Sequence, residues 1–263
     1  MNYPEKVSKH IVGWTDNYLN KTKMKGFVVG VSGGVDSALT STLCATTGKP
    51  TLCLEMPIHQ ESNQVSRANS HTNWLSKNFS NVRVKVVPLN ALYDSFCQLD
   101  ADGNDNTNTP LSLANTRSRL RMATLYYFAS QERFLVAGTG NKVEDFGIGF
   151  YTKYGDGGVD VSPIADLMKS EVRELAAHLG VHDSIVNAAP TDGLWDDNRT
   201  DEDQLGATYD ELEWAMEQQE IGKTSTDFTG RDKTVFLTYE KHHTMNKHKM
   251  VPIPICVIPQ RLK

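Results

Sequence analysis

Short apolar segments alternate with longer helical segments through the first half of the 263-residue chain. Such alternation predicts a parallel sheet that is covered by helices on both faces. The expected strands cover residues 27–31, 51–54, 82–87 and 134–137, and the expected helices between them cover residues 36–46, 60–77 and 110–131. The sequence therefore indicates the α/β class, with three α/β/α layers around a mostly parallel twisted sheet.

The second half of the chain is predicted to be mainly helical. Helical patterns cover residues 169–179, 204–219 and 233–247 and would form a helical C-terminal extension. Two segments interrupt the pattern. Residues 100–109 are rich in Gly and Asn, which predicts an exposed loop, and residues 190–203 predict a second long loop. Because no internal repeat is visible, we expect residues 1–263 to form one domain.

Composition argues against several classes of protein. Apolar residues make up 39% of the chain and the net charge is −5, whereas a general nucleic-acid binder is expected to carry a basic excess. No apolar stretch approaches the roughly 20 residues that a membrane span needs, and the N-terminal residues do not resemble a signal peptide. The four cysteines lack a CxxC pair and regular spacing. They indicate reduced, mostly buried thiols of a cytoplasmic protein. The charge and the lack of an apolar span predict that neither nucleic acid nor a membrane is a partner.

The most informative segment, GVSGGVDS, lies where the first predicted strand leads into a helix. Two adjacent glycines let backbone N–H groups turn toward one point, and the following helix adds donors and a partial positive charge. In an open α/β sheet a ligand is expected at this edge. We therefore predict a phosphate-binding loop formed by Gly30, Val31, Ser32, Gly33, Gly34, Val35, Asp36 and Ser37.

Asp36 distinguishes this loop from a Walker A motif, which has a lysine at the corresponding place. A carboxylate beside polyphosphate repels it unless a cation bridges the two, so Asp36 predicts a bound Mg²⁺. The alternative is that Asp36 or Ser37 merely caps a helix in a glycine-rich turn. With strand, loop and helix found together, we favour the functional interpretation.

The segment SGGVDS resembles the signature of the N-type ATP pyrophosphatases, which cleave ATP between the α and β phosphates and transfer AMP. The resemblance implies an adenine nucleotide alpha hydrolase-like fold. That superfamily includes NAD, GMP, asparagine and argininosuccinate synthetases and several tRNA-modifying enzymes. The loop alone does not choose among them.

A basic helical segment, NTRSRLRM, is similar to a segment of the ammonia-dependent NAD synthetases. Arg117 and Arg121 lie four residues apart and share one helix face, while Arg119 points elsewhere. The resemblance implies that Arg119 contacts a dinucleotide substrate. The alternative is a solvated basic face.

The segment GTGNKVE follows the fourth predicted strand and resembles the part of these synthetases in which a threonine binds ATP and a glutamate holds Mg²⁺. The resemblance assigns those roles to Thr139 and Glu144. The common family form is GTDHAAE, so Gly140 and Asn141 depart from it. The spacing between Glu144 and Lys153 is also one residue longer than usual.

The segment TKYGDGGVD is the most specific match to these synthetases. By resemblance, the ATP contacts include Lys169 and Thr191, and the dinucleotide contacts include Lys153, Asp160, His248 and Lys249. Considered alone, His248 is typical of a surface histidine.

The resemblance implies a ligase that uses ATP and Mg²⁺ to adenylate deamido-NAD and then uses ammonia to form NAD, releasing AMP and pyrophosphate. Asp36 and Lys169 would be catalytic, and Asp36 and Glu144 would hold the metal. Asp156 could accept a proton from ammonium, or it could simply be a turn residue. The family also implies a homodimer. A glutaminase on a separate subunit stays open.

Two other functions would use parts of the same sequence pattern. A tRNA thiolation enzyme on the same fold would need paired catalytic cysteines and a basic RNA surface, and neither is visible in the sequence. A nucleotide sensor would have no need of Asp36, Glu144 and Lys169 together. The sequence therefore favours the ligase.

Overall fold

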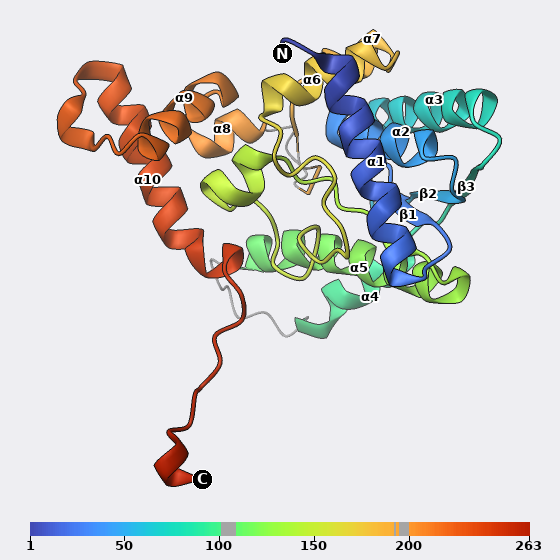
Figure 1. The fold of residues 1–263 in the computed structure, drawn as a ribbon. Helices are drawn as coiled ribbons and strands as arrows, with labels where there is room; N and C mark the ends of the chain where they lie inside the picture. The colour runs from blue at the N-terminus through green and yellow to red at the C-terminus, as the bar shows by residue number, and fades with distance from the viewer. Residues whose placement is uncertain (101–108, 192, 195–199) are drawn as a thin grey trace.

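The computed structural model describes residues 1–100, 109–191, 193–194 and 200–263. Its centre is a parallel sheet in the order β3-β2-β1-β4. Figure 1 labels β1, β2 and β3. The strands are β1 (Phe27–Gly30), β2 (Thr51–Glu55), β3 (Val82–Val86) and β4 (Leu135–Val136). All four predicted strands are present. β4 is shorter than the predicted strand 134–137. Ala137 lies outside β4 and forms an isolated parallel bridge with Val161.

The order of the strands reverses at β1. The chain proceeds from β1 to β2 and β3 on one side, and β4 then joins β1 on the other side. The carboxyl end of β1 therefore lies at a topological switch point, where open α/β sheets place their ligands.

Helices cover both faces of the sheet (Figure 1). Helices α2 (Val35–Thr46) and α3 (Ser62–Asn78) pack on one face, and α1 (Pro4–Thr22) and α6 (Lys169–His178) pack on α2. Helix α5 (Thr109–Glu132) covers the other face together with α4 (Asn90–Cys97). The three-layer α/β/α class is confirmed. Helices α1 and α4 were not predicted.

The C-terminal helices build a further apolar core beside the sheet. It joins a π-helix (Val143–Ile148) with α8 (Asp201–Leu205), α9 (Tyr209–Glu220) and α10 (Gly230–Met250). The prediction of one helix over residues 204–219 is wrong. Gly206 ends α8 with φ +75°, and the Thr208 side chain then accepts from the Glu211 N–H to start α9.

The two predicted loops have different outcomes. Residues 101–108, 192 and 195–199 lie outside the described residues, so most of the predicted 100–109 loop is not placed. The end of the predicted 190–203 loop is helical, because α8 begins at Asp201. Short helical turns cover Asp183–Val186 (α7), Gln98–Asp100, Ser225–Asp227 and Gln260–Leu262.

Residues 251–263 extend away from the helical body as an arm (Figure 1). Its apolar side chains are exposed, up to 83% for Ile255 and Val257. No described helix combines the length and apolar character that crossing a membrane requires. The four cysteines are free thiols. Cys44 and Cys53 are buried, whereas Cys97 and Cys256 are exposed, so the prediction of mostly buried thiols holds for half of them.

Candidate active site

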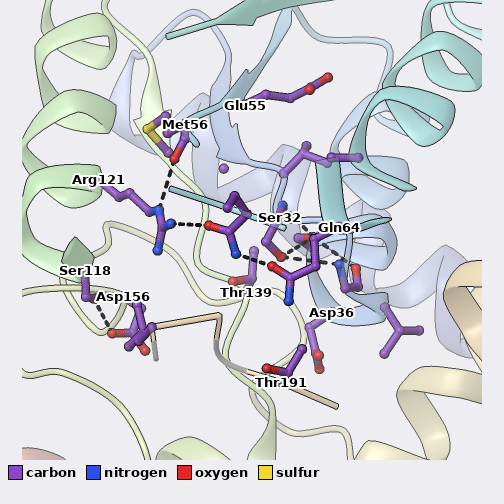
Figure 2. A pocket seen from close by; sticks show the side chains of 18 of the residues that line it. Ser32, Asp36, Glu55, Met56, Gln64, Ser118, Arg121, Thr139, Asp156 and Thr191 are labelled. Carbon is purple, nitrogen blue, oxygen red and sulfur yellow. Dashed lines mark hydrogen bonds between the residues drawn. The ribbon is translucent and has the colours of Figure 1, made fainter. Parts of the chain in front are cut away.

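A cavity of about 300 Å³ opens at the carboxyl ends of β1, β2 and β4. Its walls come from the predicted phosphate loop, α5, the segment after β4, the start of α6 and residues 188–194. Figure 2 labels Ser32, Asp36, Glu55, Met56, Gln64, Ser118, Arg121, Thr139, Asp156 and Thr191 around it. The cavity therefore lies at the switch point of the sheet, as the strand–loop–helix pattern predicts.

The predicted phosphate loop links β1 to α2. Gly33 has φ +87°, and a Cβ added there would lie 2.5 Å from the Gln64 carbonyl oxygen, so only glycine fits. The Ser32 and Ser37 hydroxyls lie 3.2 Å apart, and the Ser37 hydroxyl also accepts from the Ser32 N–H. Gly34 is the N-cap of α2. The alternative that Asp36 or Ser37 is the helix cap is therefore wrong.

Lys169 joins two carboxylates at the cavity wall. Its Nζ lies 2.7 Å from Asp36 Oδ2 and 2.9 Å from Glu144 Oε1, and its side chain is only 5% exposed. Burial alone would lower the pKa of Lys169, but the two carboxylates raise it overall. A fixed positive charge thus lies beside the predicted phosphate loop, held by residues from α2, the π-helix and α6.

Asn141 and Tyr209 complete this cluster and were not predicted as site residues. Asn141 is fully buried, donates to Asp36 Oδ1 and accepts from the Glu144 N–H. The Tyr209 hydroxyl donates to Glu144 Oε1 at 2.5 Å, and Lys169 Nζ lies 4.8 Å from the centre of the Tyr209 ring. Burial and then the charge of Glu144 raise the pKa of Tyr209 well above its usual range. Asn141 was visible in the sequence only as a departure from the common family form.

The extra residue between Glu144 and Lys153 coincides with an unusual helix. Residues Val143–Ile148 form a π-helix, and single-turn π-helices accommodate one inserted residue, frequently at functional sites. The π-helix carries Glu144 and the neighbouring Asp145. Burial, and then the charges of Glu144, Asp156 and Asp36, raise the pKa of Asp145 well above its usual range.

Asp156 lines the cavity and is held from two directions. The Ser118 hydroxyl donates to its Oδ1 at 2.6 Å (Figure 2), and the Thr152 N–H donates to the same oxygen at 3.0 Å. Burial raises the pKa of Asp156 despite these hydrogen bonds. Asp156 also lies in a turn, where the Gly155 N–H donates to the Thr152 carbonyl. Its place in a turn and its place at the cavity are therefore compatible.

Thr139 and Thr191 also line the cavity. Arg117 and Arg121 share one helix face, as predicted, but that face is not solvated. Arg117 is buried and donates to the Leu194 carbonyl at 2.6 Å, and Arg121 donates to the Met56 carbonyl and to Gln60. For these two arginines the alternative of a solvated basic face is wrong.

The remaining predicted contacts lie outside the cavity lining. Arg119 is exposed and donates to the Lys153 carbonyl at 3.4 Å, and Lys153 Nζ donates to the His248 carbonyl at 2.9 Å. Asp160 accepts from the Tyr126 hydroxyl and from the Val136 N–H, both at 2.9 Å. Arg119, Lys153 and His248 thus form a group between α5, the TKYGDGGVD segment and α10. Asp160 lies apart from this group and contacts β4.

Side chains of α10 form hydrogen bonds with the backbone of the π-helix and of the segment after it. Lys249 Nζ donates to the carbonyls of Gly149 and Tyr151, both at 2.9 Å, and Asn246 donates to the Ile148 carbonyl at 2.8 Å. His243 Nδ1 lies 2.6 Å from the Gly147 carbonyl. These contacts satisfy carbonyl groups that the end of a helix leaves unpaired. The position of Glu144 therefore depends on a helix about a hundred residues later in the chain.

Comparison with known proteins gives one consistent family. A family model described as NAD synthase matches residues 7–252. The chain is 37% identical over 232 residues to an NH(3)-dependent NAD(+) synthetase of Carboxydothermus hydrogenoformans, covering 88% of this chain and 92% of that one.

Solved structures agree on the fold. An NMN synthetase from Francisella tularensis superposes with a TM-score of 0.82 at 29% identity, covering 98% of both chains. An NH3-dependent NAD synthetase from Campylobacter jejuni superposes with a TM-score of 0.77 at 24% identity, covering 97% of this chain and 99% of that one.

Proposed function

This chain belongs to the NAD synthase family, and from this premise we propose how its cavity carries out the reaction. The activity is that of an NH3-dependent NAD(+) synthetase, a ligase that converts deamido-NAD to NAD. The observation that carries the mechanism is the buried Lys169 between Asp36 and Glu144, beside a loop built for phosphate.

The first step activates the nicotinate carboxylate. A carboxylate oxygen attacks the α-phosphorus of ATP, the bond from that phosphorus to the bridging oxygen breaks, and pyrophosphate leaves. Negative charge builds up around the α-phosphate, and fixed cations stabilise it. Lys169 would supply one such charge, while the N–H groups of residues 32–37 and the Ser32 and Ser37 hydroxyls would hold the departing pyrophosphate.

Asp36 and Glu144 are suited to hold a Mg²⁺ ion. Mg²⁺ prefers hard oxygen ligands and commonly uses one or two carboxylates plus substrate phosphates and water. Both carboxylates line the cavity beside the loop, and no described group of three His, Cys, Asp or Glu side chains would form a metal site unaided. This donor set fits a metal that arrives with the nucleotide. When bound, Mg²⁺ would supply positive charge to the phosphates.

The second step forms the amide. Ammonia attacks the acyl carbon of the adenylate, the carbon–oxygen bond to AMP breaks, and one proton must leave the nitrogen. Asp156 is proposed to accept the proton that ammonium must lose to become the nucleophile ammonia, because its carboxylate lines the cavity while Ser118 and Thr152 hold it in place.

Deamido-NAD is proposed to extend from the cavity toward α10. By family resemblance Arg119, Lys153, Asp160, His248 and Lys249 contact the dinucleotide, and Thr139 and Thr191 contact ATP. Arg119 donates to the Lys153 carbonyl and Lys153 Nζ donates to the His248 carbonyl, which supports one continuous surface for these three residues.

Assembly and location are also proposed. We propose a homodimer, which the exposed apolar arm at residues 251–263 supports, since a second chain could cover it. Residues 1–263 are proposed to act as one domain, because the C-terminal helices hold site residues in place. A cytoplasmic location is supported by the free thiols of Cys44 and Cys53.

The test is to incubate the purified chain with ATP, Mg²⁺, ammonium and deamido-NAD and to measure NAD, AMP and pyrophosphate. Equal amounts of the three products are expected. Formation of ADP and phosphate would contradict the adenylate route. Glutamine in place of ammonium should support little NAD formation, and efficient use of glutamine by the chain alone would overturn the choice of ammonia as donor.

A second substrate is favoured by one specific observation. The superposition with an NMN synthetase spans 98% of both chains, so the cavity could also amidate the mononucleotide of nicotinic acid. Parallel assays with deamido-NAD and with this mononucleotide decide the matter. A higher kcat/KM for the dinucleotide is expected, and the reverse order would make the mononucleotide the main substrate.

A further inference from the structure

Arg173 is a cation at the cavity wall to which the proposed function gives no role. It follows Lys169 by four residues on α6, so the two side chains share one helix face. Both residues line the cavity, and Arg173 is half-buried there. A guanidinium group cannot be deprotonated in a protein. The helix that carries Lys169 therefore brings a second permanent positive charge to the cavity.

The other cationic side chains of the cavity lining have partners within the chain. Arg67 donates to a carbonyl of the predicted phosphate loop, Arg121 donates to the Met56 carbonyl, and Lys169 binds two carboxylates. Among the described residues, none forms a hydrogen bond or an ion pair with the Arg173 side chain, although its Nε is buried. Buried polar groups in proteins usually have a hydrogen-bond partner. The Arg173 guanidinium is thus suited to a partner from outside the chain.

The acidic side chains of α6 and its neighbour α9 are bound elsewhere. Glu171 accepts from the backbone N–H at the start of α6, and Glu174 pairs with the N-terminal amino group. Glu213 of α9 accepts from both the N–H and the hydroxyl of Ser170. These contacts direct the nearby carboxylates away from Arg173, so its charge stays available to an anionic ligand.

The position of Arg173 favours a polyphosphate as this ligand. Helix α6 packs on α2, which begins directly after the glycines of the predicted phosphate loop. The planar fork of a guanidinium can bind two phosphate oxygens at once. Four residues of an α-helix rise by about 6 Å. Lys169 and Arg173 therefore present two cations in a row beside the loop, which matches a ligand that carries negative charge on successive phosphates.

We propose that Arg173 binds the terminal phosphate of ATP and retains the pyrophosphate once it has left the adenylate. This role rests on the proposed function, because it assumes that ATP is cleaved beside Lys169. Lys169 would face the α-phosphate, and Arg173 would face the far end of the triphosphate. Arg173 should therefore matter for ATP and pyrophosphate but not for AMP, which lacks the last two phosphates.

The first test is Arg173→Met, which removes the charge and keeps a long side chain. Binding of Mg²⁺-pyrophosphate and of AMP is measured separately by titration calorimetry. The Kd for pyrophosphate is expected to rise about tenfold or more, as for a lost hydrogen bond to a charged group, while the Kd for AMP changes by less than about twofold. The matched control is Arg83→Met, because Arg83 is exposed, pairs with Glu132 and lies outside the cavity lining. Unchanged pyrophosphate binding in folded Arg173→Met would overturn the proposal. Equal weakening of both ligands would also overturn it, because it would indicate a distorted cavity.

Steady-state kinetics give a second measurement. In Arg173→Met the KM for ATP should rise about tenfold or more, whereas the KM values for deamido-NAD and ammonium should stay within about twofold. Arg173→Lys keeps the charge but loses the planar fork, so it should recover part of the affinity for pyrophosphate. Binding no tighter than in Arg173→Met would contradict a role for the charge.

Failure of this proposal differs from failure of the proposed function. If wild type forms no NAD, AMP and pyrophosphate, the proposed function fails. If wild type is active but Arg173→Met binds pyrophosphate normally, only the role of Arg173 fails. If Arg173→Met does not fold, chemical labelling of wild type decides. Phenylglyoxal modifies arginine side chains, and peptide mass spectrometry measures the modification of Arg173. Pyrophosphate should protect Arg173 and AMP should not, and equal labelling with and without pyrophosphate would refute the proposal.

Discussion

Replacing Lys169 with alanine removes the only cation that contacts Asp36 and Glu144 among the described residues. Its Nζ lies 2.7 and 2.9 Å from the two carboxylates, and the side chain is 5% exposed. Water therefore screens this charge poorly. Loss of one preorganised hydrogen-bond donor that faces a developing negative charge typically costs about a hundredfold to a thousandfold in kcat, or about 2.7–4 kcal/mol, and we expect a loss of this size here.

The same substitution leaves two buried carboxylates without their partner. Breaking a buried ion pair by removing one member typically destabilises a protein by about 3–5 kcal/mol. We expect the free energy of unfolding of Lys169→Ala to fall by an amount in this range and to recover partly when Mg²⁺ and ATP are added. Activity must therefore be measured below the unfolding transition of the variant.

The assay for Lys169→Ala is NAD formation under saturating substrates, followed by pyrophosphate exchange. Both rates should fall together, because the charge acts in the adenylation step. Lys49→Ala is the control, since Lys49 forms a half-exposed pair with Asp16 far from the cavity, and such pairs contribute about 0–1 kcal/mol. A loss of kcat below about tenfold, or about 1.4 kcal/mol, in folded Lys169→Ala would refute the assignment.

Three further results are expected. Asp36→Ala should keep its fold, measured by thermal unfolding, but lose pyrophosphate exchange, and normal exchange would exclude Asp36 from the metal site. Gly33→Ala should lower the free energy of unfolding by about 1–3 kcal/mol, because residue 33 has a positive φ and its Cβ would meet the Gln64 carbonyl. The KM for ATP should rise as well. An unchanged Tm would contradict this expectation. At fixed total ammonium, the rate of wild type should rise as pH passes the raised pKa of Asp156, since only the deprotonated carboxylate accepts a proton. Asp156→Asn should rise only with free ammonia, and identical profiles would remove Asp156 from the mechanism.

The sequence was sufficient for the sheet and for the glycine-rich turn between β1 and α2 because both depend on local patterns. Runs of apolar residues of strand length and a glycine pair before a helix are visible without tertiary information. Helix α1 was missed although Ile11, Thr15 and Leu19 recur at helical spacing on its buried face, so the signal was present. The break at Gly206 was also visible, because a glycine followed by a threonine cap is a typical boundary between helices.

Other features of the site had no local signal that predicted their contacts. Tyr209 contacts Glu144 across 65 residues, and Asn141 contacts Asp36 across 105 residues. Neither residue type is unusual in its own segment, so only the folded chain brings them together. The π-helix was visible only as one extra residue before Lys153. Propensity does not predict a π-helix, because its stability depends on the helices packed around it.

The attachment of the π-helix to α10 has a consequence for the synthesis of the chain. A nascent chain that ends before His243 already contains the whole sheet, the phosphate loop and Lys169, yet it lacks the donors that hold the carbonyls of residues 147–149 and 151. Such a chain could bury most of its core before the π-helix that carries Glu144 and Asp145 is held in position. We therefore expect catalytic competence to appear last, after the final turns of α10 have left the ribosome, so that prematurely terminated products are folded but inactive.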